Sequence, residues 1–77
     1  MADVTWEGNS KQMLEALIEA SPKPFRKMTE TKLTEAVLSK AVDGVVTEDT
    51  IVEGIKIATP KPFQGQAMKT IEPLKSA

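Results

Sequence analysis

The apolar residues between positions 11 and 20 recur at the spacing of an α-helix. Four of them share one helical face: Met13, Leu14, Leu17 and Ile18. Prolines stand at positions 22 and 24, and because the residue before a proline avoids the α region, the helix has to end near position 20. The pattern therefore predicts a first helix over residues 11–20, with Asn9 or Ser10 as its N-cap.

A second stretch of the chain alternates apolar and polar residues at mixed three- and four-residue steps. Its apolar members are Phe25, Met28, Leu33, Ala36, Val37 and Ala41. Pro24 can open a helix because the first helical position needs no N–H donor. Gly44 suits the left-handed position just beyond a helix C-terminus. We therefore expect a second helix over about residues 24–42, with a weaker first turn before Thr29.

Thr47 marks the start of a third helix. Its hydroxyl can cap the helix, and the two acidic residues that follow, Glu48 and Asp49, face the positive end of the helix dipole. Val46 and Ile51 are spaced to form a hydrophobic staple across the cap. The predicted helix runs to about residue 58 and buries four apolar residues: Ile51, Val52, Ile55 and Ala58.

The remaining segments carry weaker patterns. Residues 63–72 can form a short last helix, although Gly65 and the lack of a strong apolar stripe weaken that prediction. Residues 1–8 and 73–77 are expected to be loose. The 77 residues are thus predicted to form a single all-α domain, a three-helix small domain with Pro-rich corners, in which a short fourth helix is an open alternative.

One thirteen-residue segment occurs twice. Met13–Phe25 and Ile51–Phe63 are identical at six of thirteen positions, including the whole of Pro-Lys-Pro-Phe. We interpret the repeat as a helix-exit corner used twice, in which the prolines fix φ and the phenylalanine packs onto the core beside the helix just left. The alternative is that the two corners are polyproline-type surfaces that offer phenylalanine and lysine to a partner.

Composition excludes several classes of function. Ten basic and eleven acidic residues nearly cancel, so there is no overall positive field for nucleic acid, and no basic amphipathic helix marks a membrane surface. The chain has neither cysteine nor histidine, which are the usual ligands of zinc, haem and iron–sulfur clusters. We therefore expect no catalytic residue, no metal, no cofactor, no nucleic-acid or membrane partner, and a cytoplasmic location.

Four residues are candidates for binding a partner. Trp6 precedes the first helix and either caps the core or anchors an interface, where tryptophan is enriched. Phe25 offers an apolar contact at the first corner. Arg26 and Lys27 belong to a basic cluster that could accept a carboxylate or phosphate, such as a tetrapyrrole propionate; the alternative is a solvated helix face.

The order of these features resembles the small helical C-terminal domain of the B subunit of light-independent protochlorophyllide reductase. The matching pieces are Trp6, Leu14 and Leu17, then Pro24-Phe25-Arg26, then Thr29-Glu30 with Ala36, then Val46-Thr47-Glu48 and Ile51. Two departures are a longer stretch before Pro24 and Pro-Lys-Pro-Phe-Arg in place of Pro-Phe-Phe-x-Arg. The part of the chain after Ala58 lies outside the pattern.

The resemblance implies a non-catalytic accessory module. Such a module would contact a nitrogenase-like reductase subunit or the tetrapyrrole substrate, while the iron–sulfur chemistry lies elsewhere. The alternative function is a general helical protein–protein interaction or oligomerisation domain that is unrelated to pigment synthesis.

Overall fold

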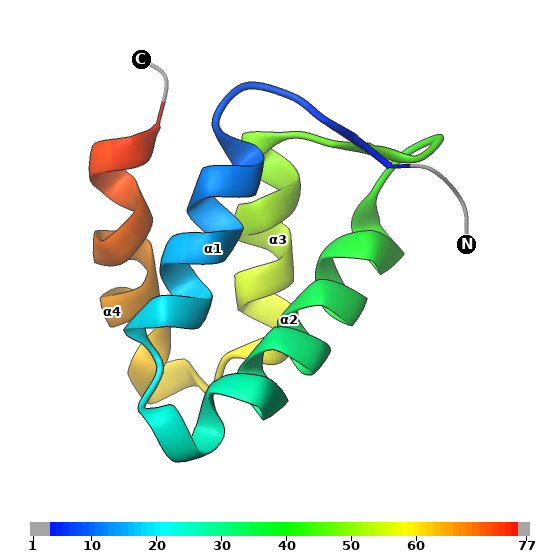
Figure 1. Cartoon of the computed structure of the whole chain (residues 1–77). Coiled ribbons are helices and arrows are strands. Elements are labelled where there is room, and N and C mark those ends of the chain that lie inside the picture. The colour runs from blue at the N-terminus through cyan, green and yellow to red at the C-terminus, as the bar shows by residue number, and fades with distance from the viewer. Residues whose placement is uncertain (1–3, 76–77) are drawn as a thin grey trace.

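The computed structural model describes residues 4–75, which form four helices. The helices are α1 (Ser10–Ala20), α2 (Arg26–Lys40), α3 (Glu48–Ala58) and α4 (Lys61–Ile71). They run alternately up and down, so that the corners after α1 and after α3 lie at the same end of the molecule (Figure 1). The all-α prediction is confirmed, and the fourth helix is as long as α1 and α3, with 11 residues each.

Two short strands lie at the opposite end from the corners (Figure 1). β1 (Thr5–Trp6) pairs in parallel with β2 (Val45–Val46), so that Trp6 stands opposite Val46. The prediction that residues 1–8 are loose is therefore wrong for this pair; residues 1–3 lie outside the described residues. The pairing joins segments far apart in sequence, and a two-residue strand leaves no periodicity that could reveal it.

The turn between α2 and β2 differs from the predicted helix end. α2 ends at Lys40 because Ala41 adopts an extended conformation, with ψ of 135°. Asp43 and Gly44 both have positive φ, 53° and 74°, and the N–H of Val45 donates to the Val42 carbonyl at 3.0 Å. Two successive residues of positive φ are typical of a type I′ turn, so Gly44 reverses the chain and does not cap α2.

The start of α3 confirms the predicted cap and adds a second hydrogen bond to it. The Thr47 hydroxyl accepts the backbone N–H of Thr50 at 3.2 Å, and the Thr50 hydroxyl accepts the N–H of Thr47 at 3.0 Å. These two bonds form a capping box that satisfies two N–H donors left free by the helix geometry. Val46 and Ile51, the predicted staple pair, are both buried in the core.

The C-terminal segment is more ordered than expected. A 3₁₀ turn follows α4 over Glu72–Leu74, and the side-chain amide of Asn9 donates to the Leu74 carbonyl at 2.8 Å. The expectation that residues 73–77 are loose is therefore wrong for residues 73 and 74; residues 76–77 lie outside the described residues. Asn9 precedes α1 as predicted, but its side chain holds the C-terminal turn and does not cap the helix.

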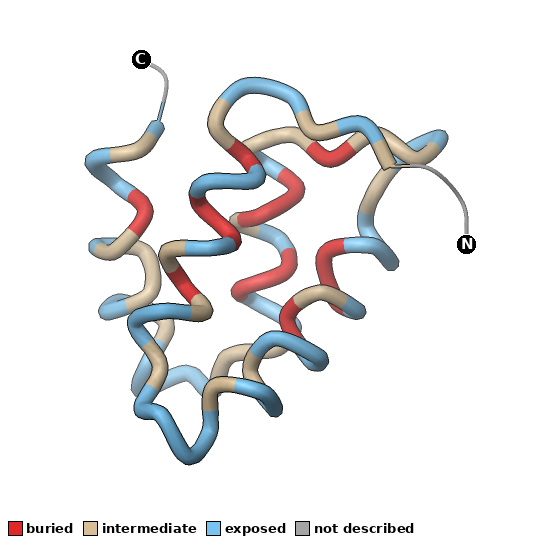
Figure 2. Tube along the Cα trace, in the orientation of Figure 1, coloured by how far each residue is buried: buried red, intermediate tan, exposed pale blue. Residues whose placement is uncertain are grey.

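The core consists of aliphatic side chains and a methionine. Its buried members are Met13, Leu14, Leu17, Leu33, Val37, Val46, Ile51, Ile55 and Ile71. Figure 2 shows the buried positions spread over all four helices and the segment before α3. α1 packs against all three other helices, and α2 and α3 form the most extensive helix pair. No helix among the described residues is both long enough and apolar enough to cross a membrane.

Gly54 allows α2 and α3 to approach each other closely. A Cβ atom added at this position would lie 2.5 Å from Val37 Cγ2 and 3.3 Å from Val37 Cα. Real Cβ atoms essentially never come that close to another heavy atom, so any larger residue would push the two helices apart. The glycine thus sets the distance between the helices that precede and follow the β2 segment.

Candidate functional site

The two Pro-Lys-Pro-Phe corners begin with the same backbone geometry, although the first continues as a 3₁₀ turn (Lys23–Phe25) before α2 and the second leads directly into α4. Pro22 has φ −57° and ψ 143°, and Pro60 has φ −57° and ψ 146°. The N–H of Phe25 donates to the Pro22 carbonyl at 2.9 Å, and the N–H of Phe63 donates to the Pro60 carbonyl at 2.9 Å. Each corner ends one helix and leads into the next, which confirms the helix-exit part of the interpretation of the repeat.

The residue after each phenylalanine closes its corner. The Nη2 of Arg26 donates to the carbonyl oxygens of Glu19 at 3.1 Å and Ser21 at 3.3 Å. In the second corner, the Nε2 of Gln64 donates to the carbonyl oxygen of Thr59 at 2.9 Å. Side-chain donors of this kind satisfy carbonyls that the end of a helix leaves without partners. The Arg26 guanidinium, a predicted ligand-binding group, is thus used to close the first corner.

The phenylalanines do not pack onto the core, which corrects the prediction made for the repeat. Phe25 is 54% exposed and Phe63 is 62% exposed. Phe25 ends the 3₁₀ turn of the first corner and Phe63 lies in the first turn of α4. The chain at this end of the molecule is mostly exposed or intermediate (Figure 2). Met28, also predicted to face the core, is 50% exposed. Three large apolar side chains therefore remain accessible at the corner end.

A groove of about 610 Å³ lies between the two corners, and we call it the corner groove. Most of its lining comes from equivalent positions of the two hairpins: Ser21 with Thr59, Pro22 with Pro60, and Phe25 with Phe63. Positions 20, 28 and 29 are matched in the same way by positions 58, 66 and 67. Leu17, Lys32 and Leu33 complete the lining on the side of α1 and α2. The groove is thus a consequence of the repeat, because two identical corners placed side by side supply both of its walls.

The charged residue in the described lining of the corner groove is a lysine. Lys32 contributes to the lining, and no described residue of the lining is acidic. Lys23 and Lys61 stand exposed between the prolines of the two corners. Within residues 4–75, no carboxylate lies within ion-pair distance of Lys23 or Lys61. The groove therefore combines a largely apolar lining with one lysine, Lys32, and each of its corners carries a further exposed lysine next to a lining proline.

The four predicted binding residues do not form one site. Phe25 lines the corner groove, whereas Arg26 and Lys27 are absent from its lining. Trp6 lies at the strand end, where it pairs with Val46 and packs against the core. Of its two predicted roles, the structure therefore supports the core cap. Phe63 is a groove residue that the sequence analysis did not single out, although its place in the repeat was the signal that could have found it.

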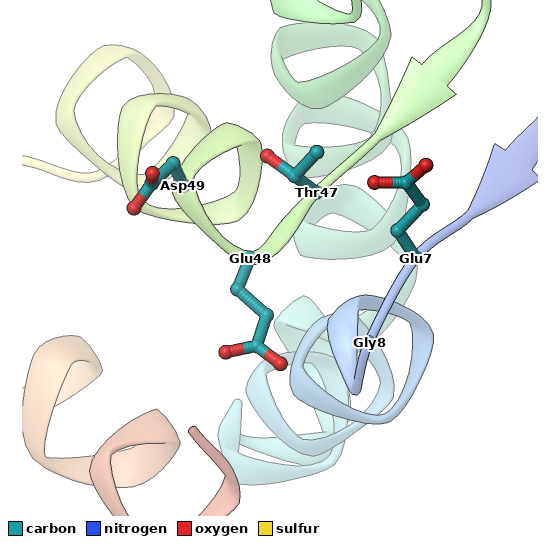
Figure 3. A pocket seen from close by; sticks show the side chains of 5 residues that line it. All are labelled: Glu7, Gly8, Thr47, Glu48 and Asp49. Atoms are coloured by element: carbon teal, nitrogen blue, oxygen red, sulfur yellow. The ribbon is translucent and has the colours of Figure 1, made fainter. Parts of the chain in front are cut away.

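A second, shallower depression of about 280 Å³ lies at the strand end (Figure 3). Glu7, Glu48 and Asp49 line it, but their side chains point in different directions. The Glu48 carboxylate accepts the backbone N–H of Asn9 at 2.9 Å. The part of the chain that the structure describes contains no group of three or more histidine, cysteine, aspartate or glutamate residues placed to hold a metal ion. Glu48 and Asp49 stand in the first turn of α3, as predicted for residues that complement the helix dipole.

A family model described as "Protein of unknown function (DUF2621)" matches residues 1–75, nearly the whole chain. The chain therefore belongs to this family. No curated protein and no solved structure matches it. The family match says nothing about protochlorophyllide reductase, so the resemblance to the domain of that enzyme stays a prediction.

Proposed function

We propose that this member of the DUF2621 family is a non-catalytic protein-binding module whose binding site is the corner groove. The observation that carries the proposal is the exposure of the same phenylalanine in both corners, on either side of one groove. The backbone geometry of the corners does not require an exposed ring. A partner that covers the rings supplies a reason for their exposure, because apolar side chains around a groove are typical of an interface.

The energy available from these side chains is sufficient for a specific contact. Fully burying a side chain of this size contributes about 1.5–3 kcal/mol. Phe25, Met28 and Phe63 line the groove and are about half exposed, so each offers roughly half of that amount to a partner. The prolines fix φ in each corner, so less conformational entropy is lost when a partner binds. A small, preorganised apolar groove therefore fits the recognition of a short partner segment.

The partner is another protein and not a second copy of this chain. Two copies that met through this face would gather Lys23, Lys32 and Lys61 of both molecules in or beside one interface, with no acidic residue in the described lining to offset them. Like charges placed opposite one another destabilise an interface. Repulsion between these lysines therefore disfavours a dimer that forms through the corner groove.

The structure gives less support to tetrapyrrole binding in the corner groove than to protein binding. Phe25 lines the groove, but Arg26, the group expected to hold a propionate, donates to main-chain carbonyls of the first corner. Direct pigment binding predicts a saturable shift of the Soret band of a magnesium porphyrin, weakened in Phe25→Ala. A reductase subunit as the protein partner, like the cytoplasmic location, stays a prediction.

Site-specific photo-cross-linking in cells tests the proposed function. A photoreactive phenylalanine analogue replaces Phe63 in one variant and Val42 in the matched control, since Val42 is 72% exposed and lies outside the groove. We expect one discrete adduct from position 63, lost when Phe25 is changed to Asp, and none from position 42. Equal adducts from both positions, or no adduct from position 63, would overturn the proposal.

A further inference from the structure

We infer that the occupant of the corner groove is an amphipathic α-helix of the partner, with an apolar face flanked by acidic residues. This inference rests on the proposed function and adds the conformation and the charge of the bound segment. It follows from three properties of the groove: which backbone groups it offers, which charges surround it, and how its two walls are related.

The backbone of the groove favours a helical occupant. An extended peptide needs external partners for its own N–H and C=O groups, as when it adds a strand to the edge of a sheet. The described lining comes from helices and from the two corners, and Pro22 and Pro60 have no N–H to donate. β1 and β2 lie at the opposite end of the molecule (Figure 1). A helix satisfies its own backbone hydrogen bonds and needs none of these groups.

The charge of the groove favours an acidic occupant. Lys23 and Lys61 are exposed, one in each corner. Lys32, a residue of α2, is part of the groove lining. The prolines on both sides of Lys23 and of Lys61 fix the backbone φ of their own positions. The main chain on both sides of each lysine is therefore restricted. Neither ammonium group has a carboxylate within ion-pair distance among the described residues. Carboxylates of a partner would complete these pairs.

The equivalence of the two walls indicates how the helix lies. Phe25 and Phe63 contribute to the lining from the two different corners. Three residues after each phenylalanine comes another lining residue: Met28 after Phe25, and Gln66 after Phe63. A helix that contacts both walls has to present apolar residues over about two turns, at i, i+3, i+4 and i+7. Its acidic residues then flank this stripe, where they meet the lysines of both corners.

Peptide binding to the full 77-residue chain tests the inference. The probe is a fluorescent, side-chain-stapled helix of about four turns, with leucine at i, i+3, i+4 and i+7 and glutamate at the flanking positions. A second probe is identical except that lysine replaces each glutamate. Fluorescence anisotropy measures both affinities, and we expect the acidic helix to bind at least about tenfold more tightly than the basic one.

Paired charge reversals locate the binding site. We expect Lys23→Glu with Lys61→Glu to weaken binding of the acidic helix by about tenfold, through two lost attractions and two new repulsions. The matched control is Lys11→Glu with Lys40→Glu, which changes the net charge equally on exposed residues of α1 and α2 at the strand end. The control should change affinity less than about twofold. Circular dichroism confirms that both double variants remain folded.

Each contrary outcome has a defined meaning. Equal binding of the acidic and basic helices, or equal loss in both double variants, would overturn the assignment of charge. Binding only to phosphatidylglycerol vesicles would overturn the helix in favour of a membrane, and a dimer lost in Phe63→Ala would favour a second copy. If neither helix binds while position 63 still cross-links to one protein, only the inference about the helix fails. If the cross-link is also missing, the proposed function fails with it.

Discussion

The first helical hairpin, α1 with α2, and the second, α3 with α4, begin alike and end differently. α1 and α3 have the same length, the two corners begin with the same proline geometry, and Leu33 and Ile71 occupy equivalent buried positions after them. Beyond those positions α2 continues to Lys40, whereas α4 gives way to a 3₁₀ turn. The part of the hairpin that is repeated is therefore the part that builds the corner groove.

The differences between the hairpins follow their packing partners. At equivalent positions α1 has Ala16 and α3 has Gly54, and at Gly54 the neighbouring Val37 of α2 lies too close for a Cβ atom. The corner, by contrast, keeps its prolines and its phenylalanine in both hairpins although the ring is exposed each time. Packing thus explains where the hairpins diverge, and local geometry together with the groove explains where they agree.

The largest effect is expected at the buried positions that the hairpins share. Leu33→Ala and Ile71→Ala should each lower the free energy of unfolding by about 2–5 kcal/mol, because each leaves a cavity in the core. Urea unfolding measures both values. A loss below about 1 kcal/mol for Ile71→Ala alone would show that the second hairpin is not held as the first one is.

Exchanging the residues that differ between α1 and α3 should give a smaller effect. Gly54→Ala is expected to lower the free energy of unfolding by about 1–3 kcal/mol through its contact with Val37, although alanine is the better helix former. Ala16→Gly, the reciprocal control, should cost only about 1 kcal/mol through helix propensity. Urea unfolding of the two variants distinguishes these causes. A Gly54→Ala variant more stable than the native chain would contradict the close approach of α2 and α3.

The closing residues of the corners should contribute less again. Arg26→Ala and Gln64→Ala each remove hydrogen bonds to carbonyls at a helix end, at a cost of about 1 kcal/mol. Arg26→Gln should retain most of the stability, because glutamine closes the second corner already. Thermal unfolding followed by circular dichroism gives the comparison. If Arg26→Gln lost as much as Arg26→Ala, the two corners would not be closed by the same interaction.

The helices were predictable because their ends are marked locally. The prolines after α1 and α3, and the hydroxyl and acids at the start of α3, each act within a few residues of the boundary they set. The pairing of Trp6 with Val46 and the hydrogen bond from Asn9 to Leu74 join distant segments, and no local pattern marks them. Most of the core residues predicted for α1 and α3 are buried, because the spacing of apolar residues along a helix identifies the face that packs inward.

The candidate site was only partly predictable. Phe25 and the repeat were recognised, but the sequence assigned the phenylalanines to the core because large apolar residues usually lie there. Their exposure depends on how far the core extends toward the corners, which is a property of the packed molecule. The groove likewise requires both corners at one end, and this follows from the up-and-down order of the helices and not from either corner alone (Figure 1).

The smallest effect on stability is expected at the phenylalanines themselves. Phe25→Ala and Phe63→Ala should each lower the free energy of unfolding by only about 1 kcal/mol or less, because more than half of each side chain is exposed. Urea unfolding of each variant is compared with Leu33→Ala as the buried control. Either variant should nevertheless weaken binding in the groove, because its ring supplies part of the apolar surface. A loss of about 3 kcal/mol or more in either variant would place that ring in the core, and the repeated phenylalanine would then serve folding and not recognition.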